Sequence, residues 1–385
     1  MNKQDMSRAS EQDVFVVADN IYSPLGKTTA ENFQNLKNNV SGVQLHNDDS
    51  LSPTPLFASI FSKDTQFITC GNGYTKFEQL LIASLSDVLI LSGIDPEDKK
   101  TVLIISTTKG NISLLETETN SSELQNRVAL TTSAKLVAKH FGFSNRPVII
   151  SNACISGIMS IITGMRLLRS ARYETAVIVG ADVISRFIVS GFQSFQALSV
   201  QACKPFDKDR NGLNLGEGAA AIVLSTNKKF KKNIKVKGGS VSNDANHISG
   251  PSRTGKELGH AIEQALRDAN LIAGDVGFIS AHGTATVYND EMEANAIGLT
   301  GLQSVPLNSL KGYYGHTLGA AGLIESVISI HSLKENWIIP TLGFDKTGVT
   351  TPVNVCTSPM HIDTTNFLKT ASGFGGCNAA VVFGK

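Results

Sequence analysis

The sequence predicts an α/β protein made of two similar halves. Short apolar runs, such as 148–150 and 276–280, alternate with segments whose apolar residues recur at helical spacing, which is typical of parallel strands covered by helices. A strand-to-helix stretch around Cys154 also corresponds to one around His316, and glycines precede a terminal apolar strand in both halves. Two such halves packed back to back would bring their corresponding loops to one shared cleft.

Unbroken apolar runs identify the strands of the first half, one-sided apolar residues identify its helices, and polar stretches with Pro or Gly identify its loops. In chain order these criteria predict a tail at 1–12, a strand at 14–18, a turn at 23–26, a long loop at 40–75, a helix with leucines between 80 and 89, a strand at 102–106, a helix within 109–145 that ends near residue 140, a strand at 148–150, a helix from 157 to about 173, a strand at 176–180, a long loop to 210 and a strand at 218–224.

The same criteria apply to the second half. They predict a strand at 234–237, a helix at 255–270, a strand at 276–280, a helix around 290–299, an apolar stretch at 305–309, a helix at 318–333 and a final strand at 379–383. We therefore expect a flexible tail at 1–12, an N-terminal half at 13–232 and a C-terminal half at 233–385.

Composition excludes several classes of protein. The formal charge of +1 argues against a nucleic-acid binder that works through bulk electrostatics. No apolar run has the length of a membrane span, and the polar N-terminus lacks the apolar core of a signal peptide. The five cysteines are scattered without metal spacing, so we expect no metal site and no disulfide framework. A cytoplasmic, reduced protein that binds neither membrane nor nucleic acid is the resulting expectation.

Cys154 lies in the turn between the strand 148–150 and the helix that follows Gly157. Unpaired amides and the helix dipole favour a thiolate at such a place, and a thiolate would make Cys154 the fastest of the five cysteines to alkylate. A free cysteine is also among the residues most often buried and inert. The local sequence leaves both interpretations open.

Two histidines lie in turns rich in Gly and Thr. His282 stands in Ala-His-Gly-Thr-Ala-Thr and His316 in Tyr-Gly-His-Thr-Leu-Gly, and glycine lets a ligand approach the backbone closely. Beside a cysteine nucleophile, two neutral imidazoles could donate to the oxygen of a thioester or enolate. Lys311 would shape the field around the second histidine, and the amides of Cys154 and Phe374 would form an oxyanion hole. This constellation predicts acyl transfer through a thioester.

Seven motifs in this order resemble those of the β-ketoacyl-ACP synthases, and more narrowly the elongating Cys-His-His type of that thiolase-fold family. They are Asn-Ala-Cys154-Ile-Ser-Gly, Lys-Pro-Phe-Asp207, Gly-Glu-Gly218, Asp244-Ala-Asn-His, Ala-His282-Gly-Thr-Ala-Thr, Lys311-x-x-x-Gly-His316-x-x-Gly-Ala-Ala-Gly and Gly-Phe374-Gly-Gly-Cys-Asn378. The resemblance implies the family's fold, a duplicated αβαβα five-layer sandwich, and usually a homodimer, with a heterodimer of related synthases as the other arrangement.

The resemblance also implies a reaction. Cys154 would take an acyl chain from acyl carrier protein as a thioester, and His282 and His316 would support decarboxylation of a malonyl thioester and stabilise its enolate. The enolate would then attack the acyl carbonyl and extend the chain by two carbons. The family binds no metal and no organic cofactor, because its substrates bring the phosphopantetheine of the carrier protein.

Further roles are carried over from the resemblance alone, position by position. Lys311 matches the active-site lysine, Glu325 and Asp290 match acidic residues that hold the site together, Thr284, Thr286 and Ser249 match contacts of the phosphopantetheine arm, and Phe374 matches the gating phenylalanine.

Some residues depart from the family's pattern. Tyr313 and Tyr314 stand where relatives often carry smaller residues, which predicts either a narrowed pocket that prefers planar, unsaturated acyl chains or two rings that pack away from the pocket. Ser372 replaces a bulky residue, Cys377 replaces a threonine, and the stretch 105–145 is short. These departures are compatible with a specialised polyene or polyketide pathway as well as with fatty-acid synthesis.

Three alternatives remain open from the residues. A thiolase would use a second cysteine near the C-terminus, where Cys377 stands, with one histidine. A priming synthase of the Cys-His-Asn type would carry asparagine in place of His316. A non-catalytic partner of the chain-length-factor kind commonly lacks the cysteine, which this chain keeps.

Overall fold

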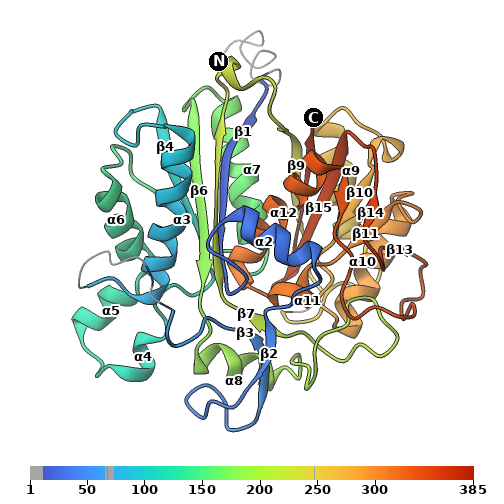
Figure 1. Ribbon diagram of the computed structural model, residues 1–385, viewed down its shortest axis with the longest axis horizontal. Coiled ribbons are helices and arrows are strands. Elements are labelled where there is room, and N and C mark those ends of the chain that lie inside the picture. Colours follow the sequence, from blue (N-terminus) through green and yellow to red (C-terminus); the bar gives the residue numbers. More distant parts are fainter. Residues whose placement is uncertain (1–11, 66, 68–72, 247) are drawn as a thin grey trace.

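The computed structural model describes residues 12–65, 67, 73–246 and 248–385, and an 11-stranded mixed sheet runs through these residues (Figure 1). Residues 1–11 of the predicted tail, Cys70 and His247 lie outside them. Across the sheet the order is β13 (Asn354–Val355), β11 (Pro306–Asn308), β10 (Phe278–Ser280), β15 (Asn366–Gly373), β16 (Cys377–Gly384), β9 (Lys235–Asn243), β1 (Phe15–Tyr22), β8 (Gly218–Ser225), β6 (Thr175–Asp182), β4 (Thr101–Ser106) and β5 (Val148–Ile150).

The N-terminal and C-terminal parts of this sheet have the same strand order. The orders are β1-β8-β6-β4-β5 in the N-terminal part and β9-β16-β15-β10-β11 in the C-terminal part, with β13 added at the edge. In each part the first two pairings are antiparallel and the last two are parallel. The expectation of purely parallel sheets is therefore wrong, because β8 and β16 each pair with both neighbours in the antiparallel sense. The boundary at 232/233 stays a prediction of the sequence.

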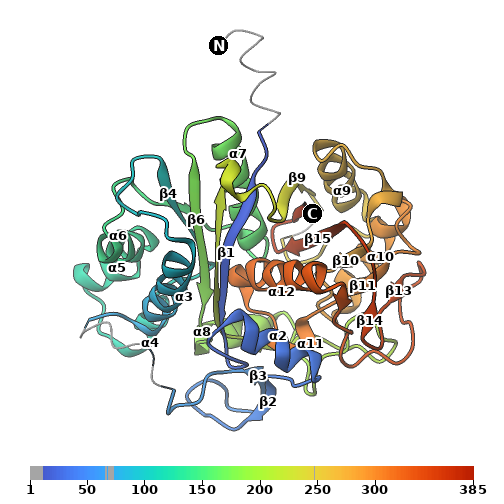
Figure 2. The same ribbon diagram turned by 45° about the horizontal axis from the view of Figure 1, so that its top comes forward.

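Helices complete five layers (Figures 1 and 2). On the N-terminal part, α3 (Lys76–Ser92) and α6 (Leu130–Phe141) cover the outer face; α7 (Ser156–Arg169) and α12 (Ala321–Glu335) lie in the middle; and α9 (Lys256–Asp268) and α10 (Val287–Leu299) cover the outer face of the C-terminal part. The predicted αβαβα sandwich is confirmed.

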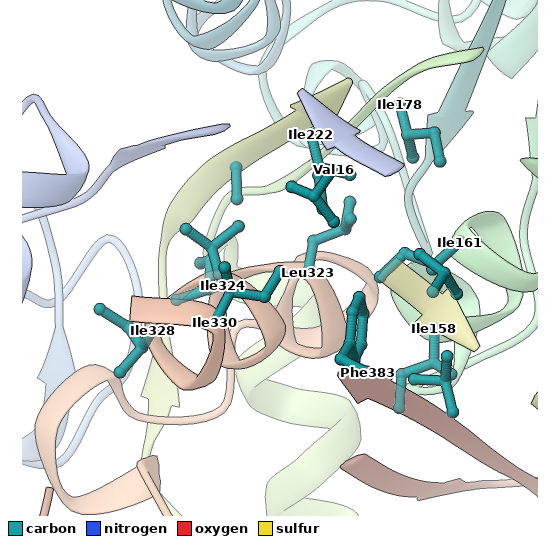
Figure 3. Packing of buried hydrophobic residues seen from close by; sticks show 14 of the residues in the cluster. Val16, Ile158, Ile161, Ile178, Ile222, Leu323, Ile324, Ile328, Ile330 and Phe383 are labelled. Atoms are coloured by element: carbon teal, nitrogen blue, oxygen red, sulfur yellow. The ribbon is translucent and has the colours of Figure 1, made fainter. Parts of the chain in front are cut away.

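Strand residues alternate between the middle layer and the outer layers, because successive side chains of a strand point to opposite faces. Ile178 and Ile222 belong to the central core, which Figure 3 shows together with Leu323 of α12, whereas Val177 and Val223 pack beneath α3. A sheet covered on both faces needs such apolar residues on both, so its strands appear in the sequence as continuous apolar runs.

Close backbone contact brings the two central helices together. A Cβ atom on Gly157 of α7 would lie 2.7 Å from the backbone nitrogen of Leu323 in α12, so only glycine allows this approach. The N-termini of α7 and α12 follow Cys154 and His316 respectively. The crossing therefore positions the two predicted site residues relative to each other.

Several predicted loops contain regular elements. The stretch 40–75 holds β2 (Val43–His46) and β3 (Leu56–Ser59), the loop before 210 holds α8 (Arg186–Ser194), and the segment 109–145 holds α4 (Leu114–Thr117) and α5 (Ser122–Val128) besides α6. Elements that were not predicted at all are α2 (Thr29–Lys37), β7 (Leu215–Gly216), which pairs with β3, α11 (Lys311–Tyr314), β12 (Trp337–Ile338), β13, β14 (Met360–His361) and the buried strand β15, whose apolar residues are interrupted by Lys369, Thr370 and Ser372. Most of these are too short, or too exposed, to show a hydrophobic period.

Within the part of the chain that the structure describes, no helix is long and apolar enough to cross a membrane.

Candidate active site

A cavity of about 460 Å³ brings together most of the residues that the sequence singled out. Of the predicted site residues, those that line it are Cys154, Ser249, His282, Thr284, Thr286, His316 and Phe374. Lys311, Glu325 and Asp290 do not line the cavity; they contact the segments that carry its two histidines.

The turn that presents Cys154 is strained and tightly held. Ala153 has a φ of 44°, in the left-handed region that costs an L-residue about 1–2 kcal/mol. The Ser156 hydroxyl fixes this turn, since its Oγ donates to the Ala153 carbonyl (2.6 Å) and accepts from the Asn152 amide (2.8 Å). Such strain at the residue before a cysteine that lines a cavity is typical of a functional turn.

The resting charge of Cys154 differs from the prediction. Burial raises the pKa of its thiol to about 12, and the nearby Cys377 adds to this rise, while Lys311 and Lys109 act in the opposite direction. The pKa values of the described cysteines Cys203, at about 12, and Cys356, at about 11, are raised as well. The prediction of a low-pKa thiolate is wrong for this state, because loss of water outweighs the helix dipole.

The two histidine rings contact each other edge to face. Their centroids are 5.2 Å apart with the planes at 82°. The backbone of His316 is bound to the segment around β7, since its amide donates to Asn214 (2.7 Å) and its carbonyl accepts from Gly216 (3.0 Å). On the other side, the amides of His282 and Gly283 each donate to the Glu293 carboxylate at 2.8 Å.

Both imidazoles are held in the neutral form. Burial lowers the pKa of His282 well below its usual value, and the positive charges of Lys311 and Lys369 lower it further. The pKa of His316 is lowered by burial and by the same two lysines. A neutral ring carries one donor and one acceptor nitrogen, so each ring can donate to a developing oxyanion.

Lys311 lies directly behind these rings. Its Nζ donates to the His282 carbonyl at 2.9 Å and forms an ion pair with Glu325. Both side chains are buried, and a buried ammonium requires such a partner.

Asp290 holds the loop after His282. Its carboxylate accepts from the amides of Thr284 (2.9 Å) and Phe206 (2.7 Å). Burial raises the pKa of Asp290 to about 7. The loop therefore depends on an acid that water does not reach.

Phe374 follows the strand β15 and its ring packs against two aromatic residues at α8. It stacks on Phe192 at a centroid distance of 5.6 Å and meets Phe195 edge-on at 5.2 Å. A Cβ atom on Gly373 would lie 2.9 Å from the Cys154 amide nitrogen. The backbone next to Phe374 thus passes beside the amide of the cysteine.

Three hydroxyl groups lie along the same cavity. The Thr284 and Thr286 hydroxyls form a hydrogen bond with each other at 2.9 Å, and Ser249 lines the cavity with them. Short polar side chains of this kind suit an amide-containing arm.

Of the two arrangements predicted for Tyr313 and Tyr314, the rings that pack away from the pocket are confirmed and the narrowed pocket is wrong. Both rings are buried in the central core, where the Tyr313 hydroxyl donates to Asn39 (3.1 Å) and the Tyr314 hydroxyl to Asn32 (3.2 Å). Neither lines the cavity. Their amphipathic rings find hydrogen-bond partners toward α2, which the sequence reasoning had not recognised as a helix.

Cys377 also lies outside the cavity lining. Its sulfur is 3.4 Å from the Phe374 carbonyl oxygen and 3.8 Å from that of Asn152. Ser372, the other departure, lines the cavity and donates to Asn378 at 2.7 Å. The position of Cys377 gives no support to a thiolase-type second cysteine.

Sequence reasoning missed several residues that hold this site. They are Phe192 and Phe195 at α8, Glu293 on α10 and Lys369 on β15. Two signals were available: Glu293 is one helical turn after Asp290, and Lys369 is the only charged residue in the stretch 364–384.

Comparisons with known proteins cover most of the chain. Residues 11–229 match the family "Beta-ketoacyl synthase, N-terminal domain", and residues 234–345 match "Beta-ketoacyl synthase, C-terminal domain". A curated relative, the 3-oxoacyl-[acyl-carrier-protein] synthase 2 of Vibrio harveyi, is 28% identical over an alignment of 412 residues, gaps included. This alignment covers 98% of this chain and 99% of the relative.

Solved structures show the same fold. The ketosynthase ApeO in complex with its chain length factor ApeC, from Xenorhabdus doucetiae, is similar with a TM-score of 0.86 at 24% identity, covering 97% of this chain and 98% of that one. The type II polyketide acyl-carrier protein in complex with its ketosynthase, AntDE:AntF, gives a TM-score of 0.85 at 22% identity over 97% and 99% of the two chains. At these identities the likeness establishes the fold.

Proposed function

The chain belongs to the beta-ketoacyl synthase family, whose members are acyltransferases, and on that premise we propose that it condenses an acyl group carried on Cys154 with a malonyl group carried on acyl carrier protein. The observation that supports this most directly is the meeting of Cys154, His282 and His316 at one cavity.

The first half-reaction loads the cysteine. The Cys154 sulfur attacks the carbonyl of an acyl thioester, its proton passes to a neutral imidazole of the cavity, and the pantetheine thiol leaves with a proton. Because burial raises the pKa of Cys154, the thiolate forms only as the bond forms. The amides of Cys154 and Phe374 are the donors that we assign to the oxyanion.

The second half-reaction makes the carbon–carbon bond. Malonyl thioester loses CO₂, and the electron pair of the broken bond becomes an enolate whose oxygen accepts from His282 and His316. The enolate carbon attacks the acyl carbonyl on Cys154, and the tetrahedral intermediate expels the Cys154 sulfur, which regains a proton. The product is a 3-oxoacyl thioester two carbons longer.

The substrate arm and the partners follow from the same proposal. We assign Thr284, Thr286 and Ser249 to the phosphopantetheine arm, so the reaction needs no resident cofactor. The edge strand β5 pairs only with β4 within the described chain, and a second synthase chain is the partner that we propose for its free side, as a homodimer or as a heterodimer of the ketosynthase and chain-length-factor kind. The cytoplasm suits an enzyme that needs a free thiol.

These observations fit more than one biosynthetic pathway. Fatty-acid and polyketide synthesis both use this chemistry, and the planar-chain preference loses its basis because Tyr313 and Tyr314 face the core. We favour the synthase over a thiolase because Cys377 does not line the cavity, and over a non-catalytic partner because Cys154 does.

Intact-protein mass measurement tests the proposal. Acyl-ACP should add one acyl mass to the protein, the Cys154→Ala protein should gain none, and malonyl-ACP should then convert the acyl-enzyme into a 3-oxoacyl-ACP. Acylation of Cys377 or Cys203 in place of Cys154, or acylation without any condensation product, would contradict it.

A further inference from the structure

Lys369 has no role in the reaction described above, yet its side chain is completely buried within β15. Its Nζ donates to the carbonyls of Ser280 (3.1 Å), Ala281 (3.2 Å) and Thr370 (2.9 Å). It also forms an ion pair with Glu325 at 2.7 Å. A buried ammonium with four oxygen partners is a built feature, because an unpaired one would be strongly destabilising.

The contacts of Lys369 join those of Lys311 at the end of β10. Lys311 donates to the His282 carbonyl at 2.9 Å. Three successive carbonyls, those of residues 280, 281 and 282, therefore accept from two ammonium groups, and Glu325 on α12 binds both of these groups. The backbone that presents His282 is thus fixed from behind by two lysines that come from different elements.

We propose that Lys369 is a positioning residue of the condensation reaction: together with Lys311 it fixes the end of β10 that presents His282, and it adds one positive charge to the buried groups behind both histidines. This inference rests on the proposed function, because it concerns the two histidines that we assign to decarboxylation.

The charges around the histidines support this role. Two ammonium groups and the Glu325 carboxylate leave one net positive charge behind the rings. The other acids that face His282 come from α10, where Glu293 accepts from its amide and Asp290 accepts from the Thr284 amide. Without Lys369, Lys311 and Glu325 would neutralise each other, and protonation of the imidazoles would become easier.

A charge series tests the proposal through the pH dependence of the overall condensation, which includes the loading of Cys154. Lys369→Met removes one positive charge and should move the acid limb of the rate profile upward by about one pH unit, because a protonated imidazole has no acceptor nitrogen for the proton that Cys154 releases during loading. Lys369→Arg keeps the charge and should leave the limb in place. The double variant Lys369→Met with Glu325→Gln restores one net positive charge through Lys311, and its limb should return toward that of the unmodified protein.

A matched control separates charge from loosened structure. Thr370→Val, the neighbouring position on β15, removes a 2.6 Å hydrogen bond to Glu293 without changing charge, and should lower the rate with no movement of the limb. Lys369→Gln, which keeps N–H donors for the carbonyls, is the second neutral variant if Lys369→Met does not fold.

The outcomes are distinct. An unmoved limb in a folded neutral variant, or equal limb shifts in Lys369→Gln and Thr370→Val, would overturn the role of Lys369. Absence of decarboxylation by the unmodified protein at every pH would instead overturn the proposed function.

Discussion

Gly216→Ala should damage the site through the backbone of His316. Gly216 donates from its amide to the His316 carbonyl at 3.0 Å, and a Cβ atom at this position would lie only 1.9 Å from the Tyr314 carbonyl oxygen. Real Cβ contacts stay above 3.0 Å, so the two segments would have to separate by about 1 Å. Nothing flexible can yield, because the obstructing atom belongs to the backbone.

This displacement sets the size of the expected effect. Overpacking of this kind lowers the free energy of unfolding by about 1–3 kcal/mol. A shift of about 1 Å at a catalytic group costs on the order of 10²-fold in rate, so the kcat for malonyl-ACP decarboxylation should fall by about that factor. Urea denaturation followed by circular dichroism measures the first effect, and release of CO₂ from malonyl-ACP measures the second.

Gly191→Ala is the matched control for this change. Gly191 lies on α8, and an added Cβ atom there would meet no atom within 4 Å. Alanine in a helix is favoured over glycine by about 1 kcal/mol, so this variant should be as stable as the unmodified protein or more stable, with unchanged decarboxylation. A Gly216→Ala protein with normal stability and normal rate would refute the reasoning.

Three further predictions concern other parts of the molecule. His282→Ala and His316→Ala should each lower decarboxylation by about 10²–10³-fold while acylation of Cys154 persists, and equal loss in both half-reactions would contradict the assigned roles. Burial alone would raise the pKa of Glu78, but hydrogen bonds led by that from Arg127 lower it to about 2, so its stabilisation is present above pH 4.5 and is lost as the pH falls through about 2. Glu78→Gln should therefore lower the free energy of unfolding by about 3 kcal/mol at pH 7 and by much less at pH 3. Urea titrations at the two pH values measure this difference, and equal losses at both would contradict it. Tyr314→Phe should cost about 1 kcal/mol for the lost bond to Asn32 and leave acyl-chain preference unchanged in competition between saturated and polyunsaturated acyl-ACPs; an altered preference would show that the ring reaches the pocket.

Local sequence was sufficient wherever an element is continuous and strongly patterned. The strand 148–150 has the predicted bounds, and Cys154 and His316 precede the two central helices as their turns indicated. The shared cleft followed from the correspondence between the halves, and the identical strand orders bear it out. These features depend on neighbours in the chain, which periodicity and turn residues record directly.

Tertiary structure alone decided three properties of the site. It buried Cys154 and so raised its pKa, against the local helix dipole; it turned Tyr313 and Tyr314 toward α2; and it paired Lys369 with Glu325 across two elements. Each depends on groups far apart in the chain, and a one-dimensional pattern does not contain the distance between them. Burial and pairing set the cost of a charge, so the electrostatics of this site come from the assembled layers, whereas the identities of its reactive groups come from the sequence.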